Sequence, residues 1–128
     1  MIHLDANYLI RGTQTGSPED AALRRWLETS QPVAASAIAW MEFVSGPVSP
    51  TVVESIRHAL GGRIVAFTPV EAELAASLYN ATGRRRVLRY DCMIAAAAIG
   101  AGASLATANT ADFQLFVPHG LKLSNPDF

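Results

Sequence analysis

Short apolar runs alternate with longer segments of mixed polarity along the chain. The apolar runs cover residues 2–4, 33–35, 64–67, 104–106 and 121–123. Each run has the length of a strand and is too short for a helix. The pattern therefore predicts short strands separated by segments that are long enough to form helices.

Three of the intervening segments begin with the same helix-start signal, a hydroxyl side chain followed by proline: Ser17-Pro18, Ser49-Pro50 and Thr68-Pro69. The hydroxyl can cap the first turn, and proline is tolerated at the first helical position. Glycines at 61–62 and 83 are stop signals. The signals predict helices over about 18–28, from 50 to the glycines at 61–62, and over about 69–80.

Strands that alternate with helical segments are typical of βαβ units. We expect an α/β fold in which a parallel sheet of about five strands is flanked by helices. The length of 128 residues suits one domain and is too short for two ordinary ones, so the predicted domain spans residues 1–128.

Composition narrows the class of protein. The chain has 11 acidic and 10 basic residues, so it lacks the global positive field of many nucleic-acid-binding proteins. Cys92 is the only cysteine, which excludes an internal disulfide and favours a reducing, cytoplasmic setting. Asp5 interrupts the first apolar segment and argues against a signal peptide. Small and polar residues break the uncharged stretch 92–111, which we interpret as buried helix, turn and strand.

Several acidic residues stand alone in apolar surroundings. Glu42 is the only charged residue between positions 29 and 53, and Asp91 is the only one between 90 and 111. The residues around Glu42 are apolar on nearly all sides of a helix, which predicts a buried helix. A buried carboxylate needs a cation, a hydrogen-bonding partner or a water-filled pocket.

Each acid also has a structural interpretation. Asp5 and Asp91 stand where a helix is expected to begin and could be N-caps. Asp112 follows Asn109 at the spacing of a capping box. Glu42 has no capping role in mid-helix, so its structural alternative is a buried hydrogen bond or ion pair.

The predicted topology brings these acids toward one edge of the sheet. Asp5 follows the first strand, and Asn109 and Asp112 follow the strand at 104–106. Sites in open parallel sheets form outside the carboxyl ends of the strands. Carboxylates that share one cleft repel one another unless a cation neutralises them, and oxygen ligands favour Mg²⁺ or Mn²⁺ over zinc.

Four segments carry a resemblance to a known family. They read LDANYLI at 4–10, SAIAWMEF at 36–43, YDCMIAAAA at 90–98 and LATANTADF at 105–113. In this order and spacing the chain resembles PIN-domain ribonucleases, and among them the VapC-type toxins of toxin–antitoxin pairs. The resemblance covers essentially the whole chain.

The resemblance implies a Mg²⁺- or Mn²⁺-dependent endoribonuclease, the toxin of a type II system, in which a metal-activated water hydrolyses RNA and leaves 5′-phosphate and 3′-hydroxyl ends. Its acidic quartet would be Asp5, Glu42, Asp91 and Asp112. Asp5 and Asp91 would be the most direct metal ligands, and Glu42 would complete the site. The fourth place would be filled by Asp112 or by Asn109, since family members differ there.

The resemblance also implies supporting residues and partners. Asn7 and Thr107 match small polar positions that line the pocket, with turn and capping hydrogen bonds as the alternative. The implied partners are an RNA substrate, a VapB-like antitoxin and a second copy of the chain in a homodimer.

A run of arginines precedes Asp91: Arg84, Arg85, Arg86 and Arg89. Arginine suits bidentate contact with phosphate, so we expect this run to contact RNA or the antitoxin, with a solvated loop as the alternative. The near-zero net charge then hides two opposed local fields, an acidic pocket and a basic run beside it.

Other functions fit the sequence less well. A phosphatase with an aspartyl nucleophile would carry a second Asp at the place of Asn7, and the only lysine, Lys122, is near the C-terminus. A PIN-fold RNA-processing nuclease without an antitoxin remains an alternative. A catalytically silent RNA-binding module is a further alternative, against which the complete set of four acids argues.

Overall fold

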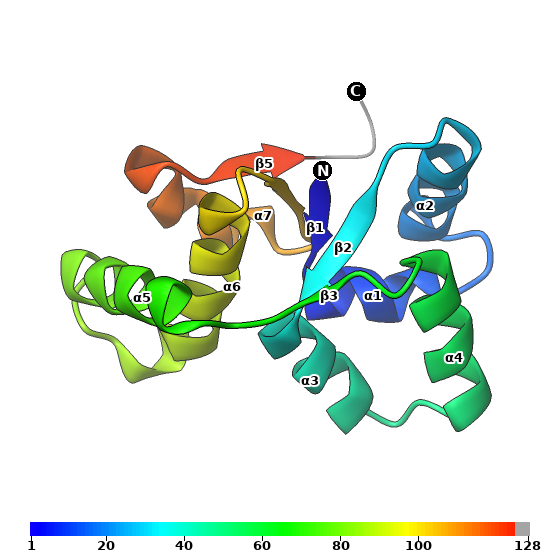
Figure 1. Cartoon of the computed structure of the whole chain (residues 1–128), viewed down its shortest axis with the longest axis horizontal. Helices are drawn as coiled ribbons and strands as arrows, with labels where there is room; N and C mark the ends of the chain where they lie inside the picture. Colours follow the sequence, from blue (N-terminus) through cyan, green and yellow to red (C-terminus); the bar gives the residue numbers. More distant parts are fainter. Residues whose placement is uncertain (125–128) are drawn as a thin grey trace.

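The computed structural model describes residues 1–124. Figure 1 shows the order of the elements along the chain. The strands are β1 (Ile2–Leu4), β2 (Val33–Ser36), β3 (Ile64–Val65), β4 (Ser104–Ala106) and β5 (Lys122–Ser124). The helices are α1 (Ala6–Gly12), α2 (Pro18–Glu28), α3 (Ala37–Ser45), α4 (Pro50–Ala59), α5 (Pro69–Ala81), α6 (Arg89–Gly100) and α7 (Thr110–Phe113), with 3₁₀ turns η1 (Arg86–Leu88) and η2 (Gln114–His119).

The five strands form one parallel sheet in the order β3-β2-β1-β4-β5. The chain builds outward from β1 through β2 to β3, then returns to place β4 on the other side of β1. The strand order therefore reverses between β1 and β4, and the carboxyl ends of these two strands are where a doubly wound sheet forms its ligand crevice. The predicted α/β class and parallel sheet are confirmed.

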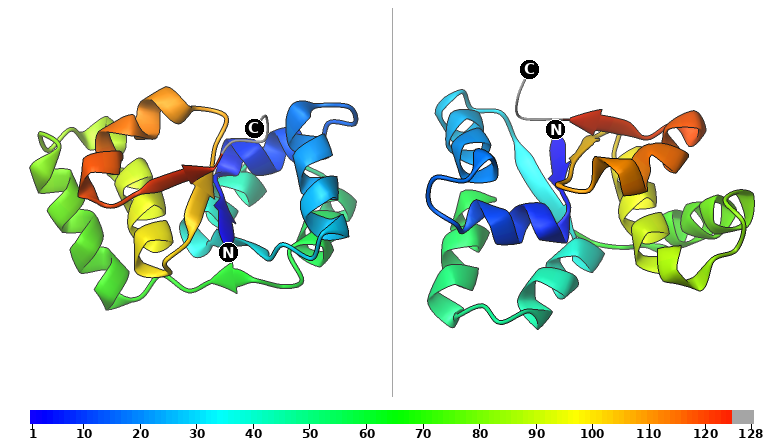
Figure 2. Two further views of the ribbon diagram at one scale, coloured as in Figure 1. Left: turned by 90° about the horizontal axis from the view of Figure 1, so that it is seen from above. Right: turned by 180° about the vertical axis from the view of Figure 1, so that it is seen from behind.

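Helices cover both faces of the sheet. Viewed from above, α5 and α6 stand on one side of the strands and α1 and α2 on the other (Figure 2). Two apolar clusters match these layers: one contains Leu105 and the alanine-rich α6, the other Ile2, Leu4 and residues of α1 and α2. Neighbouring residues of a strand point to opposite faces, which explains why β4 contributes Leu105 to the first cluster and Ala106 to the second.

The helix-start signals are confirmed. The Ser17 hydroxyl accepts from the Asp20 N–H at 3.0 Å, and the Ser49 hydroxyl accepts from the Val52 N–H at 3.2 Å. At the third signal the Thr68 N–H donates to the Glu71 carboxylate at 3.0 Å. These three bonds satisfy backbone donors that a helix start otherwise leaves unpaired.

Strand boundaries differ from the prediction in small ways. β2 extends to Ser36, which also caps α3 by accepting from the Ala39 N–H at 3.1 Å. β3 covers only residues 64–65 of the predicted 64–67, because it pairs with β2 alone at the edge of the sheet. β5 is shifted by one residue from the predicted 121–123, and residues 125–128 of the predicted domain lie outside the described residues.

The prediction that the helix around Glu42 is buried on nearly all sides is wrong. α3 buries only Ala39 and Phe43, while Met41 and Val44 are 42% and 44% exposed. One face of α3 packs on the domain, and the other face carries the exposed Met41 and Val44. The apolar composition correctly predicted a helix at α3, but it did not predict how many faces of that helix the rest of the chain covers.

The uncharged stretch 92–111 is helix, turn and strand, as predicted. Across residues 1–124, none of the helices combines the length and the apolar character needed to cross a bilayer.

Candidate functional site

Asp5 sits at the carboxyl end of β1 and begins α1. Its carboxylate accepts from the Ala6 N–H through Oδ1 at 2.8 Å and from the Thr107 hydroxyl through Oδ2, also at 2.8 Å. The Asp5 N–H donates to the Ala106 carbonyl at 3.0 Å, which ties the end of β1 to the end of β4. Asp5 is therefore the N-cap that the structural interpretation predicted, and it caps its helix at the point where the strand order reverses.

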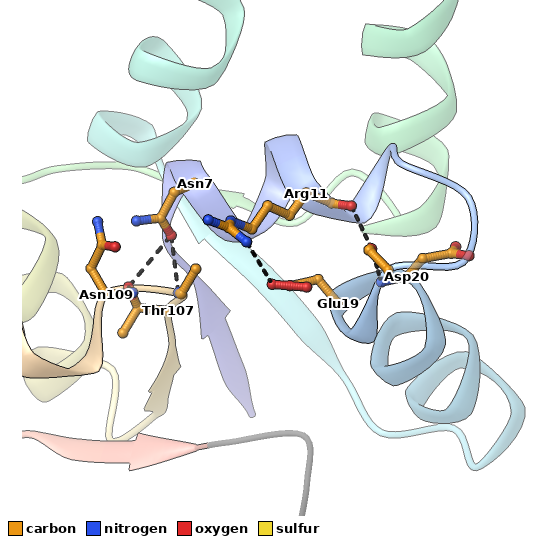
Figure 3. A network of polar contacts seen from close by, with 8 residues as sticks. Asn7, Arg11, Glu19, Asp20, Thr107 and Asn109 are labelled. Atoms are coloured by element: carbon orange, nitrogen blue, oxygen red, sulfur yellow. Dashed lines mark hydrogen bonds and ion pairs between the residues drawn. The ribbon is translucent and has the colours of Figure 1, made fainter.

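The loop after β4 is held against α1 by side-chain hydrogen bonds (Figure 3). The Asn7 carbonyl oxygen accepts from the Ala108 N–H at 3.1 Å and lies 3.4 Å from the Thr107 hydroxyl. Thr107 Oγ1 in turn accepts from the Asn109 N–H at 3.0 Å. The turn bonds expected of Asn7 and Thr107 are thus present, and they fix the orientation of the Asp5 carboxylate.

Beside this loop is a pocket of about 290 Å³. Its lining consists of Asp5, Ala6, Asn7, Ile10, Glu42, Asp91, Asn109, Asp112 and Phe113. Glu42 comes from α3, Asp91 from the first turn of α6 and Asp112 from the first turn of α7. The structure thus brings all four predicted acids, and both candidates for the fourth place, to one pocket.

The capping interpretations of the other acids are wrong. Asp91 lies inside the first turn of α6, and the N-cap position belongs to Leu88. Asn109 makes no side-chain cap bond to α7, and the Asp112 N–H donates to the Asn109 backbone carbonyl at 3.0 Å, so no capping box forms. Within residues 1–124, no hydrogen bond or ion pair engages the carboxylates of Glu42, Asp91 and Asp112.

Burial and mutual repulsion raise the pKa values in this pocket. Burial, together with the negative charges of Asp5, Glu42 and Asp112, raises the pKa of Asp91 to about 6. Burial, with the charge of Asp5, also raises the pKa of Glu42. Burial raises the pKa of Asp5 although the hydrogen bonds from Thr107 and Ala6 act in the opposite direction. Carboxylates with raised pKa values and no facing cation have the electrostatics of a site for a positive ion.

The donor chemistry fits Mg²⁺ or Mn²⁺. The pocket offers carboxylate and amide oxygens and no thiol or imidazole among its lining residues. In residues 1–124 no three Asp, Glu, His or Cys side chains stand close enough to enclose an ion by themselves. Mg²⁺ does not require such a cage, because it keeps several waters and binds through one or two carboxylates and substrate phosphates.

None of the arginines of the run lines the carboxylate pocket, although the run ends two residues before Asp91. The Arg84 guanidinium donates to the Asn80 side chain and stacks over the Tyr79 ring at 5.7 Å. Arg86 and Arg89 line a different, larger pocket of about 410 Å³ between α5 and α6. That pocket is mainly apolar and contains no carboxylate, so we assign the chemistry to the smaller one. Arg84, Arg86 and Arg89 thus lie toward α5, and the expected contact of the run with RNA or the antitoxin stays a prediction.

Sequence reasoning missed Ala6, Ile10 and Phe113 as lining residues. The helical period of α1 gives a signal for Ile10, which lies three residues after Asn7 and therefore on the same face.

An open parallel sheet with an acidic pocket at its switch point defines an α/β domain with a candidate cation site. The chain belongs to the PIN domain family, whose model matches residues 2–115. The resemblance that the four sequence segments carry is confirmed.

Solved structures share the fold over nearly the whole chain. FitAcB from Neisseria gonorrhoeae has a TM-score of 0.72 at 24% identity, with 98% of each chain covered. A toxin-antitoxin complex from Klebsiella pneumoniae has a TM-score of 0.70 at 28% identity, covering 89% of this chain and 91% of the other. DNA-bound VapBC from Salmonella typhimurium has a TM-score of 0.72 at 20% identity, covering 98% and 97%. A comparison with curated proteins gives no match.

Proposed function

We propose that this protein is a divalent-metal-dependent endoribonuclease and the toxin of a toxin–antitoxin pair. The observation that carries the proposal is the convergence of four carboxylates, from four separate parts of the chain, on one pocket of a PIN domain. Phosphodiester hydrolysis needs positive charge at the phosphate, and a carboxylate cluster supplies it by holding cations.

The chain's own residues have distinct roles in this proposal. Asp5 and Asp91 hold Mg²⁺ or Mn²⁺, and Thr107 keeps the Asp5 carboxylate turned toward the pocket through its 2.8 Å hydrogen bond. Glu42 completes the acidic wall from α3, and Asp112 or Asn109 fills the fourth place. When bound, such an ion supplies Lewis-acid stabilisation of the phosphate and activation of the attacking water.

The partners belong to the same proposal. Similarity to a toxin-antitoxin complex and to VapBC supports a VapB-like antitoxin as partner. A homodimer is supported by the apolar side chains that the single chain leaves exposed on α3, Met41 and Val44. A cytoplasmic site of action is supported by Cys92, which is a buried free thiol.

RNA cleavage tests the catalytic part. Purified protein is incubated with a panel of structured RNAs in Mg²⁺, and in parallel with excess chelator. We expect endonucleolytic fragments with 5′-phosphate ends in Mg²⁺ only, and none from Asp91→Asn. Cleavage that persists in chelator, or in Asp91→Asn, contradicts the proposal.

Expression in a bacterial host tests the toxin part. We expect induction of the wild-type chain to arrest growth, Asp91→Asn to have no effect, and co-expression of a neighbouring antitoxin reading frame to restore growth. A chain that cleaves RNA without arresting growth would instead be a PIN-fold RNA-processing nuclease.

A further inference from the structure

Arg11 lies at the edge of the carboxylate pocket without belonging to the predicted site. It is one helical turn beyond Asn7 on α1 and directly follows Ile10, and both of these neighbours line the pocket. Residues four apart on a helix share a face. In Figure 3 the Arg11 side chain runs back along α1 toward Asn7, with its guanidinium between Asn7 and Glu19.

Glu19 of α2 keeps the guanidinium at this position. Its side chain is only 9% exposed, and its Oε1 lies 3.9 Å from Arg11 Nη1. Its other oxygen, Oε2, is buried with no hydrogen-bond partner among residues 1–124. A buried carboxylate is costly unless a cation faces it, so the field of Glu19 restrains Arg11.

The restraint leaves the donors of Arg11 available. A distance of 3.9 Å is too long for a hydrogen bond, and the Arg11 guanidinium donates to no other residue in the described chain. The Arg11 side chain is 56% exposed. It is therefore a positioned cation with unused N–H groups that face solvent beside an acidic pocket.

The backbone around Arg11 is fixed as well. The Ser17 hydroxyl donates to the Arg11 carbonyl at 2.7 Å, which closes the loop from α1 to α2. Gly12 lets the two helices approach closely, because a Cβ there would overlap the side chain of Leu23. Arg11 and Glu19 thus sit on a tight helical hairpin that determines their separation.

The pocket needs such a cation. Its lining holds four carboxylates and no basic residue, so a polyanionic strand that enters it is repelled wherever a bound ion does not screen the carboxylates. The arginine run before Asp91 does not line this pocket. We propose that Arg11 binds a backbone phosphate of the RNA strand next to the one that is cleaved, with Glu19 holding the guanidinium in place. This inference rests on the proposed ribonuclease function.

Steady-state kinetics of Arg11→Gln test the inference. A phosphate contact made equally in the ground state and the transition state affects KM and leaves kcat unchanged. We expect KM to rise about tenfold in Arg11→Gln. The dependence of log KM on log salt should become shallower by about one unit, as for the loss of one phosphate contact. Arg11→Lys should restore part of the affinity because it keeps the charge.

Arg24→Gln is the matched control. Arg24 lies on α2, pairs with Asp20 at 3.0 Å and carries the same charge, but it does not adjoin the pocket lining. We expect its KM and salt dependence to equal those of the wild type. Arg24→Gln should keep the wild-type melting temperature within a few degrees, since exposed ion pairs contribute little to stability. Arg11→Gln leaves the buried Glu19 carboxylate without its cation and should lower the melting temperature, so its kinetics are measured at a temperature at which the variant is folded. Arg11→Lys keeps a cation at Glu19 and should lose less stability.

Binding separates failure of this inference from failure of the proposed function. A fluorescein-labelled single-stranded RNA of mixed sequence is titrated with Asp91→Asn protein in Mg²⁺, with and without Arg11→Gln or Arg24→Gln. RNA binding that is weakened by Arg11→Gln but not by Arg24→Gln supports the phosphate contact. Equal KM and equal binding for both arginine variants, in a protein that cleaves RNA, overturn the role of Arg11 only. A wild-type protein that neither cleaves nor binds RNA overturns both proposals.

Discussion

The carboxylate of Asp5 supports the fold and the pocket at the same time. One oxygen caps α1 and the other accepts from Thr107, while the side chain also lines the acidic pocket. A substitution at a residue with both roles is difficult to interpret, because a loss of activity can result from a loss of stability.

We predict that Asp5→Ala lowers the free energy of unfolding by about 1–2 kcal/mol, through loss of the cap and of the buried partner of Thr107. Urea denaturation of the metal-free protein measures this. Asp112→Ala is the control, since the Asp112 side chain makes no hydrogen bond among residues 1–124. Unchanged stability of Asp5→Ala would contradict the hydrogen bonds described for it.

Replacement of Asp91 should raise the stability of the metal-free protein, in contrast to Asp5→Ala. Its pKa is raised from an ordinary 3.8 to about 6, so the fold disfavours its charged form. The resulting loss of stability develops as pH rises from 3.8 to about 6 and is complete above that window.

We therefore predict that Asp91→Asn raises the melting temperature of the metal-free protein at neutral pH, and that the difference disappears below pH 3.8. Scanning calorimetry across this pH range measures it. A lower melting temperature for Asp91→Asn at neutral pH would show that the carboxylate stabilises the helix start instead of straining the pocket.

At the residue scale, the signal that best predicted the site was an acidic residue standing alone in an apolar stretch. Glu42 and Asp91 stand alone in apolar stretches, and both line the pocket. Proximity in sequence was a poor signal: Arg86 and Arg89 nearly adjoin Asp91 in the chain but line another pocket. Arg11 was missed because its partner, Glu19, lies on a different helix, and no helical period connects the two.

At the scale of elements, the α1–α2 hairpin depends on Gly12. We predict that Gly12→Ala lowers the free energy of unfolding by about 1–2 kcal/mol, because the Leu23 side chain must leave its place in the core. Thermal denaturation measures the effect. In the control, Gly100→Ala, the added Cβ meets only the Glu71 side chain at 3.6 Å, so stability should be unchanged or slightly higher. Equal stability of both variants would contradict the close helix approach.

Local signals determined where elements begin more securely than how they pack. Ser17, Ser49 and Thr68 start α2, α4 and α5 because a cap acts within one turn of backbone. The exposed face of α3 had no such signal. Whether Met41 and Val44 are covered depends on elements that are distant in the sequence. The apolar pattern of α3 does not tell how many such elements pack on it.

At the scale of the whole molecule, topology assembles the site. The strand order reverses between β1 and β4, and the loops that follow these strands carry Asp5 on one side and Thr107 with Asn109 on the other. The starts of α6 and α7 add Asp91 and Asp112. The net charge of −1 conceals this concentration of negative charge, which is why composition alone argued against a nucleic-acid partner.

Binding of Mn²⁺ to the purified protein tests the central claim most directly. Isothermal titration calorimetry compares the wild type with Asp91→Asn and with Glu73→Gln, which removes the same charge from an exposed position of α5 outside the pocket. We predict that the wild type and Glu73→Gln bind Mn²⁺ alike and that Asp91→Asn binds at least tenfold more weakly or not at all. Equal Mn²⁺ binding by Asp91→Asn, or none by the wild type, would contradict the assignment of the four carboxylates to a metal site.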